Sequence, residues 1–157
     1  MANVYTTYAT DQLAALTDGS ERPTLPLNGG NVHTVQVTRT AYTPATADPL
    51  YLVRLPKGAR VIANNCAVDF TDPATSGGAV TGDVGYIYDD GTGAVAAYAD
   101  NIALGEAAGS KQFHGAPGTA NTAPVTLANS AWVYVTWGTI TNVSAHTQVW
   151  TITYTLG

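Results

Sequence analysis

The chain has 157 residues, enough for one domain with a substantial core and an additional arm. Hydrophobic residues make up 45% and charged residues only 11%, so the chain is too apolar for general disorder and unusually poor in charge for a freely diffusing protein. The net charge is -5 and the six Lys and Arg residues do not cluster, so a nucleic-acid partner is not expected. This composition suits either a protein held against fixed neighbours or a Thr-rich secreted domain.

The sequence indicates neither export nor membrane insertion. No stretch approaches the roughly 20 apolar residues that span a bilayer, and the start at Met1–Tyr5 has no basic or apolar signal region. A single cysteine, Cys66, excludes an intrachain disulfide, so stability is expected from packing and from oligomerisation. We therefore expect the chain to be made in a cytoplasm and to stay there until assembly or lysis.

The first thirty residues are predicted to form an extended arm. Asp11–Leu16 is predicted to form a short helical turn that ends at Gly19. Residues 23–30 contain two prolines and two glycines, which exclude a central strand or a long helix. We expect residues 1–30 to be poorly ordered alone and to become ordered on a partner, and residues 31–157 to form a β-sandwich domain.

Beyond the arm, apolar and polar side chains alternate with the period of half-buried strands. Strands are predicted around Val35–Val37 and at Leu50–Leu55, the second followed by a type I turn at Leu55–Gly58. A third strand at Arg60–Phe70 is expected to bulge or bend near Asn64–Asn65, where polar residues interrupt its apolar row.

The second half of the chain is predicted to contain one hairpin, long loops and three further strands. Asp90–Gly91 is a strong hairpin signal between two runs of strand-forming residues. Residues 72–78 are rich in turn residues and are predicted to form a loop. Residues 100–123 are poor in strand signal and are predicted to form a long surface loop or a distorted excursion at a sheet edge. The remaining strands are Pro124–Leu127, Ala131–Trp137 and Gln148–Leu156. About eight short strands favour an all-β fold, a β-sandwich of the jelly-roll type.

The aromatic residues of the last strands allow two interpretations. Trp150, Ile152, Tyr154 and Leu156 share one face and are expected in the core, while the Thr-rich opposite face is expected in solvent. Trp132 and Trp137 have opposite parity, so one of them is expected to point outward. An outward Trp favours a protein interface over a sugar-binding platform built from Trp132, Tyr134 and Trp137.

No group of residues indicates a metal or a cofactor, and neither is expected. The three histidines lack the spacing of a zinc site: His33, His114 and His146. Three aspartates lie close together beside glycines but lack the offsets of a calcium loop: Asp83, Asp89 and Asp90. Turn chemistry explains these aspartates without a metal.

Catalysis is not expected either. Cys66 lies on an apolar row with no basic residue within five positions, which predicts a core residue and not a reactive thiol. The GxSxG motif of a serine hydrolase is absent. The only glutamates, Glu21 and Glu106, lie outside the predicted strands and do not suggest a glycosidase pair.

Three stretches follow a recognisable order. An aromatic start at Val4–Tyr8 leads into the arm, and the text YLVRLPKGARVI at Tyr51–Ile62 precedes GDVGYIYD at Gly82–Asp89. Together they resemble the capsid decoration proteins of tailed bacteriophages, also called auxiliary or cement proteins. The resemblance implies a β-sandwich or jelly-roll body, homotrimers and no catalytic residues.

We therefore expect a capsid decoration protein on the virion surface that binds the major capsid protein and stabilises the shell. Alternatives are a head-fibre or tail-associated virion protein with the same β body, and a carbohydrate-binding module. The side chains expected to contact a partner are Tyr5, Tyr8, Leu13, Leu16 and Trp137.

Overall fold

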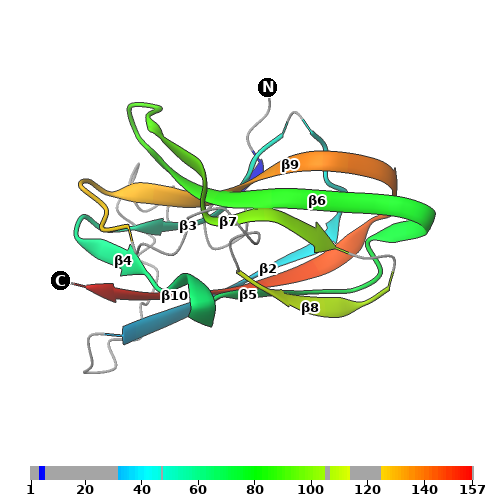
Figure 1. Ribbon diagram of the computed structural model, residues 1–157, viewed down its shortest axis with the longest axis horizontal. Coiled ribbons are helices and arrows are strands. Elements are labelled where there is room, and N and C mark those ends of the chain that lie inside the picture. The colour runs from blue at the N-terminus through cyan, green and yellow to red at the C-terminus, as the bar shows by residue number, and fades with distance from the viewer. Residues whose placement is uncertain (1–3, 6–31, 47, 105–106, 114–124, 157) are drawn as a thin grey trace, which may run out of the picture.

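The computed structural model describes residues 4–5, 32–46, 48–104, 107–113 and 125–156. Ten strands in these ranges form two sheets that face each other as a sandwich (Figure 1). In strand order, sheet A contains β1 (Val4–Tyr5), β3 (Leu50–Leu55), β9 (Ala131–Val143), β6 (Ala74–Tyr88) and β7 (Gly93–Leu104). Sheet B contains β2 (Val32–Tyr42), β10 (His146–Leu156), β5 (Ala67–Phe70) and β8 (Gly109–Gln112), and β4 (Ala59–Val61) also pairs with β10.

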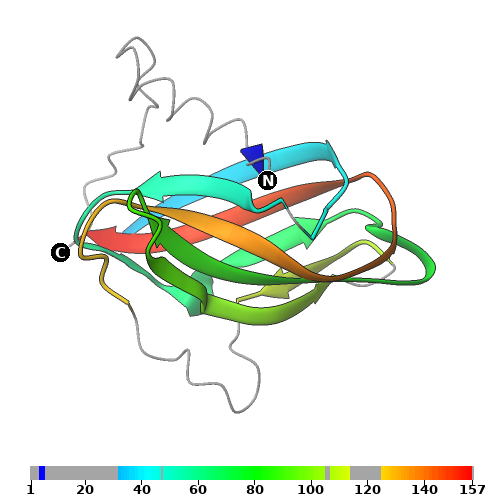
Figure 2. The ribbon, with the colours of Figure 1, turned by 90° about the horizontal axis from the view of Figure 1, so that it is seen from above.

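The path of the chain between the two sheets is that of a jelly roll. From β2 in sheet B the chain passes to β3 in sheet A, back to β4 and β5, and over again to the β6–β7 hairpin. It then returns through β8 in sheet B and β9 in sheet A to β10 in sheet B. Figure 2, the view from above, shows sheet A lying over sheet B. The predicted all-β, jelly-roll-like sandwich is confirmed.

The core lies between the sheets and follows from the period-two pattern of the strands. In β10 three of the four residues predicted on the core face are buried, with Trp150 1%, Ile152 0% and Tyr154 2% exposed. The fourth, Leu156, is the last residue of the strand and is 37% exposed. Large fully buried side chains from the other elements complete the core; they include Tyr98, Phe113, Leu50, Leu52, Leu55 and Leu127. Burial of so many large apolar side chains is the main force that holds the sheets together.

The prediction for β3 is confirmed, whereas the turn after it lies one residue further along. The Ala59 amide donates to the Pro56 carbonyl at 3.1 Å, so the turn spans Pro56–Ala59. Gly58 occupies its third position with φ 85°, as a type II turn requires, and not the fourth position of a type I turn.

The single strand predicted at Arg60–Phe70 is broken in the structure. A 3-10 turn, η1 (Ala63–Asn65), separates β4 from β5 at the predicted site of a bend. The break shifts the alternation of inward and outward side chains between β4 and β5. Asn64, predicted on the core face, is therefore exposed, whereas Cys66 and Val68 lie in the core as predicted.

The loop predicted at residues 77–78 and the strand predicted at residues 124–127 were wrong. The region 100–123, predicted as a surface loop or an edge excursion, contains residues of strands at the edges of both sheets. Gly77–Gly78 lie inside β6 at a bulge, and the region 100–123 contains the end of β7 and all of β8. Residues 125–127 form no strand; Thr126 makes an isolated bridge to Arg60. Paired neighbours satisfy the backbone of these segments despite their weak strand propensity, because sheet formation depends on context.

The hairpin predicted at Asp90–Gly91 is confirmed, and a glycine lets its strands approach closely. The end of the β6–β7 hairpin bends away from the sandwich (Figure 1). A Cβ on Gly85 would lie 1.9 Å from the carbonyl oxygen of Ala94 and 2.2 Å from that of Val95. Both atoms belong to the backbone, so a side chain at Gly85 would force the strands apart.

We expect Gly85→Ala to lower the free energy of unfolding by about 3 kcal/mol, through this clash. Gly91→Ala is the matched control in the same hairpin, because a Cβ there meets nothing within 4 Å and only the positive φ of 83° opposes it. Its cost should be about 1 kcal/mol. Urea denaturation measures both, and equal costs would contradict the close approach at Gly85.

Candidate interaction surfaces

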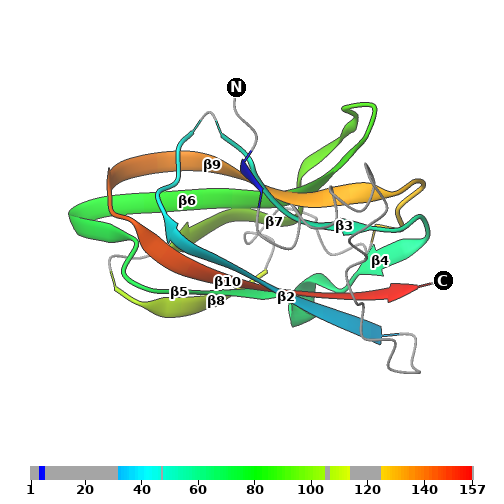
Figure 3. The same cartoon turned by 180° about the vertical axis from the view of Figure 1, so that it is seen from behind.

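The first surface is the edge of sheet A beside β3. Val4 and Tyr5 form β1, which pairs in parallel with β3 in the register Val4–Leu50 and Tyr5–Tyr51 (Figure 3). The start of the predicted arm thus adds a strand to the sheet of its own chain and covers one sheet edge. The predicted contact residues Tyr8, Leu13 and Leu16 and the predicted helical turn lie outside the described residues, and so does the side chain of Tyr5.

The second surface is an aromatic group that we call the outer patch: Tyr51, Trp132 and Tyr134, with Ile87 packed against them. Strand alternation places Trp132 and Tyr134 opposite the core residue Val133, on the outer face of sheet A. The Tyr51 ring lies 5.9 Å from Trp132 at 84°, edge to face, and 6.0 Å from Tyr134. Burial, with a smaller effect of Tyr51, raises the pKa of Tyr134.

Trp137, the predicted partner contact on the body, lies in the core. It is 4% exposed, and its indole Nε1 donates to Tyr42 Oη at 2.9 Å. Its ring also lies 6.5 Å from that of Trp150. Burial raises the pKa of Tyr42 to about 12. Of the two tryptophans with opposite parity, Trp132 is therefore the outward one, and a contact at Trp137 would require the sandwich to open.

The third surface is the outer face of sheet B, which is rich in hydroxyl groups and also carries the exposed side chains of Asp69 and Arg60. Thr34 and Thr153 share a hydrogen bond at 3.2 Å, and the Gln36 side chain donates to Thr151 Oγ1 at 3.3 Å. Along β2 the outward residues are exposed. This face therefore presents neutral donors and acceptors together with charged side chains to any neighbour.

A chain of polar side chains crosses the core along β10, which the sequence reasoning did not find. Trp150 Nε1 donates to Gln148 Oε1 at 3.0 Å, and Gln148 Nε2 donates to His146 Nε2 at 2.7 Å. His146 Nδ1 in turn donates to the Ser144 carbonyl at 2.9 Å. This order requires a neutral imidazole protonated on Nδ1. Burial lowers the pKa of His146, against the opposing effects of Ser144 and Asp72.

The structure does not bring the histidines together with other ligands. His33 stacks on the Tyr154 ring at 5.3 Å, His146 belongs to the core chain, and His114 lies outside the described residues. Within the described ranges, no group of three or more His, Cys, Asp or Glu residues could hold a metal ion. In the same ranges no helix is long and apolar enough to cross a membrane. The sequence-based expectation of a metal-free protein stays a prediction.

Each of the three clustered aspartates has its own structural partner. Asp83 Oδ1 accepts from the Asn101 amide at 2.7 Å. Asp90 Oδ1 accepts from the Thr92 amide at 2.8 Å and its hydroxyl at 2.6 Å, which lowers the pKa of Asp90. Asp90 is therefore a turn-forming residue, as the sequence predicted. Asp83 is not: it lies inside β6 and accepts from β7 where the register of the two strands shifts.

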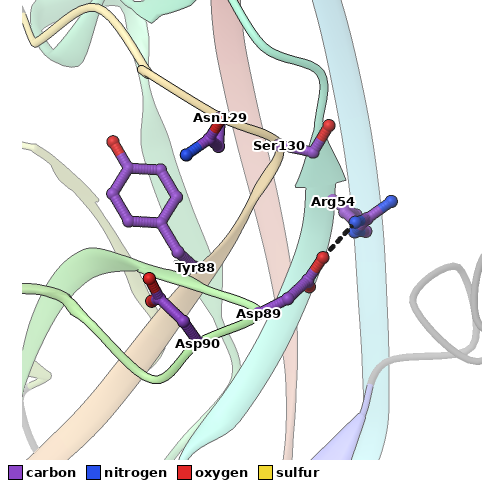
Figure 4. A pocket seen from close by; sticks show the side chains of 6 residues that line it. All are labelled: Arg54, Tyr88, Asp89, Asp90, Asn129 and Ser130. Atoms are coloured by element: carbon purple, nitrogen blue, oxygen red, sulfur yellow. Dashed lines mark hydrogen bonds and ion pairs between the residues drawn. The ribbon is translucent and has the colours of Figure 1, made fainter.

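The third aspartate, Asp89, pairs with Arg54 at 2.5 Å across a pocket of about 350 Å³ beside the β6–β7 turn (Figure 4). The pocket is lined by Arg54, Tyr88, Asp89, Asp90, Asn129 and Ser130. Sites for small molecules are mostly apolar with a few polar groups, whereas five of these six side chains are polar or charged. The ion pair ties the hairpin to β3, which is a structural role.

Cys66 is fully buried, as the sequence predicted. Its thiol donates to the Ile62 carbonyl at 3.3 Å, and the Thr153 amide donates to its sulfur at 3.2 Å. Burial raises the pKa of Cys66 to about 11. The thiol therefore stays protonated at neutral pH and is a packing group.

No protein-family model matches the sequence, and no curated protein matches it. Among solved structures, the fold is similar to that of a chain in the capsid of Ralstonia phage GP4, with a TM-score of 0.71 and 19% identity over 99% of each chain. It is also similar to a chain in the capsid asymmetric unit of cyanophage Pam1, with a TM-score of 0.53 and 24% identity over 88% of this chain and 96% of that one. The chain therefore shares its sandwich fold with chains found in two phage capsids.

Proposed function

We propose that this chain is a structural protein of a phage virion that binds the outside of the capsid as a decoration or cement protein and stabilises the shell. The observation that carries the proposal is the likeness to the chain in the Ralstonia phage GP4 capsid, which extends over 99% of both chains. The likeness therefore involves the complete sandwich, and not a small motif that many β proteins share.

The surface of the described body fits this role. The low charge of the chain and the hydroxyl groups on the outer face of sheet B suit a protein held at fixed neighbours, since such a protein needs less surface charge to stay in solution. The proposed partner is the major capsid protein. We further propose that three copies associate as a symmetric ring, and sedimentation of the purified chain at micromolar concentration tests this state. The chain would be made in the host cytoplasm and end on the virion surface.

The other two functions receive less support. A head-fibre or tail-associated protein could have the same β body, and its place in the virion distinguishes it. A sugar platform would need open aromatic faces, but Trp132, Tyr134 and Trp137 are at most 8% exposed. These rings therefore do not form an open platform for a sugar.

Binding of the purified chain to capsids assembled without it tests the proposal. We expect saturable co-sedimentation with the capsids and a higher temperature of shell disassembly at saturation, because binding to the assembled state stabilises it. Serum albumin at the same concentration is the control for trapping. A chain that stays in the supernatant at micromolar concentration and leaves the disassembly temperature unchanged would overturn the proposal.

A further inference from the structure

The indole of Trp150 fixes the direction of every hydrogen bond in the buried polar chain along β10. An indole N–H only donates, so Gln148 must present its carbonyl oxygen Oε1 to Trp150 Nε1, at 3.0 Å. The NH2 group on the other side of the amide then faces His146 Nε2 at 2.7 Å, and it also only donates. His146 Nε2 is therefore an acceptor, and the ring proton lies on Nδ1, which donates to the Ser144 carbonyl at 2.9 Å. The tryptophan thus determines the tautomer of the histidine.

A protonated His146 does not fit this arrangement. An imidazolium carries an N–H on both ring nitrogens. Nδ1 keeps its bond to Ser144, but the new N–H on Nε2 points at the NH2 group of Gln148, so that two donors meet. His146 is 3% and Gln148 0% exposed, so solvent has little access to relieve the conflict. The chain satisfies all of its polar groups only while His146 is neutral.

Rotation of the Gln148 amide moves this conflict from one end of the chain to the other. The oxygen and the NH2 group of an amide are similar in size, so a half-turn about the last side-chain bond exchanges them with little change in packing. After the half-turn, Oε1 accepts a charge-assisted hydrogen bond from the imidazolium. The NH2 group then faces the indole of Trp150, which loses its acceptor. The same side chains therefore have two arrangements, one for each protonation state of His146.

Trp150 lies where such a change reaches the aromatic core. Its side chain is 1% exposed, and its ring lies 5.9 Å from Phe113 and 6.5 Å from Trp137. Trp137 belongs to β9 in sheet A, and its own indole donates to Tyr42 Oη, a separate acceptor. Trp150 thus connects the polar chain of sheet B to the packing between the sheets.

The titratable and charged groups around the polar chain come from β2, from β5 and from the loop after β5. On β2, Tyr42 lies opposite His146 and Arg39 lies opposite Gln148. Burial raises the pKa of Tyr42 to about 12, so this hydroxyl stays neutral in acid, and the guanidinium of Arg39 stays charged. Asp72, in the loop after β5, favours the protonated form of His146, but less than burial opposes it.

The carboxylate of β5 faces away from the polar chain. Asp69 is exposed and lies opposite Val149, whose alternation places it on the outer face of sheet B. Of the groups named, Asp72 is therefore the one that acts on His146 and also titrates in acid. The experiment must separate its titration from that of His146.

We propose that His146, Gln148 and Trp150 form a proton-operated switch, in which proton uptake by His146 turns the Gln148 amide over and releases the indole N–H of Trp150. The neutral state ties the tryptophan to the polar chain, and the protonated state leaves it held by packing alone. Burial lowers the pKa of His146, so the switch operates on the acid side of the ordinary histidine range. It belongs to the sandwich itself and is independent of the proposed capsid attachment.

Nitrogen-15 NMR of the full chain tests the switch. At neutral pH the ring nitrogens of His146 should report the tautomer protonated on Nδ1. Between pH 7.5 and pH 4.5 the indole N–H signal of Trp150 should move with the same midpoint as the His146 ring. The indole of Trp137 should move far less, because its acceptor is Tyr42. Relative to Trp137, hydrogen exchange of the Trp150 indole should become about tenfold faster or more in the protonated state.

Two variants separate the members of the switch. His146→Gln should abolish the movement of the Trp150 signal, because the chain then has no group that titrates. Gln148→Glu supplies a carboxylate that accepts from both neighbours, so the Trp150 indole should keep its acceptor at every pH. The midpoint of His146 should then rise by about one pH unit or more. Backbone amide spectra at pH 7.5 show that each variant is folded.

His33→Gln is the matched control, and it should leave the Trp150 response unchanged. His33 stacks on the Tyr154 ring, at the other end of the β2–β10 pair from His146. The control removes a histidine from the same sheet without touching the polar chain.

A Trp150 signal that stays fixed while His146 titrates would overturn the proposal, and so would the tautomer protonated on Nε2 at neutral pH. A Trp150 response that survives in His146→Gln would assign the effect to Asp72 and would equally overturn it. Unfolding of the chain before His146 takes up a proton has the same consequence, because the folded protein would then have no protonated state.

Discussion

Replacing Trp137 with alanine is expected to lower the free energy of unfolding by about 3–5 kcal/mol. The ring is 4% exposed and lies between the Tyr42 and Trp150 rings. Its removal leaves a cavity in the middle of the sandwich and also leaves the Tyr42 hydroxyl without its indole donor. Urea denaturation followed by circular dichroism measures the loss.

Trp137→Phe is the matched control, because it keeps most of the ring and loses the indole N–H. Its cost should be smaller, about 1–2 kcal/mol. If Trp137→Ala instead costs less than about 1 kcal/mol, the ring is not in the core and the partner contact expected from the sequence becomes the better account.

Replacing Gln148 with leucine should cost about 2–4 kcal/mol, although leucine is close in volume and apolar. Gln148 is fully buried and lies between the Trp150 indole and the His146 imidazole. The substitution leaves a buried donor on one side and a buried acceptor on the other, each without a partner. Urea denaturation at pH 7.5 measures the loss, and Thr151→Val on the outer face of the same strand is the control. A neutral effect of Gln148→Leu would contradict the hydrogen-bonded chain.

The hydrogen-bonded side chains of His146, Gln148 and Trp150 also make the stability of the fold depend on pH. Burial lowers the pKa of His146 below 6.5, so below that pH the unfolded chain binds a proton that the folded chain excludes. The contribution of His146 is therefore complete above pH 6.5 and decreases as the pH falls towards the folded pKa. We expect the unfolding free energy of the wild type to fall more steeply between pH 7 and pH 5 than that of His146→Gln. Parallel curves would contradict a neutral buried imidazole.

The strands with a single apolar face were predictable from the sequence. The bounds of β3 and the core face of β10 follow from hydrophobic runs and from period two, and the β6–β7 hairpin follows from Asp90–Gly91. The segments around Gly77 and Gly109 were missed, because pairing with β9 and β5 holds them as strands against their propensity.

The outward tryptophan could not be chosen from the sequence, because both faces of β9 are apolar. Val133, Val135 and Trp137 face the core, while Trp132 and Tyr134 form part of the outer patch. Alternation then shows that the two tryptophans lie on opposite faces of β9, but it does not show which of them faces the core. The buried positions of His146 and Gln148 could have been inferred, because alternation along β10 places both on the same face as Trp150. They were missed because a search for apolar residues does not assign polar residues to a core face.

Quantitative mass spectrometry of purified virions tests the proposed function most directly. The proposal predicts that this chain is present at many copies per particle, in a fixed ratio to the major capsid protein, because decoration sites repeat with the symmetry of the shell. A chain that is absent from washed virions, or present at only the few copies of a tail component, would contradict a capsid decoration protein.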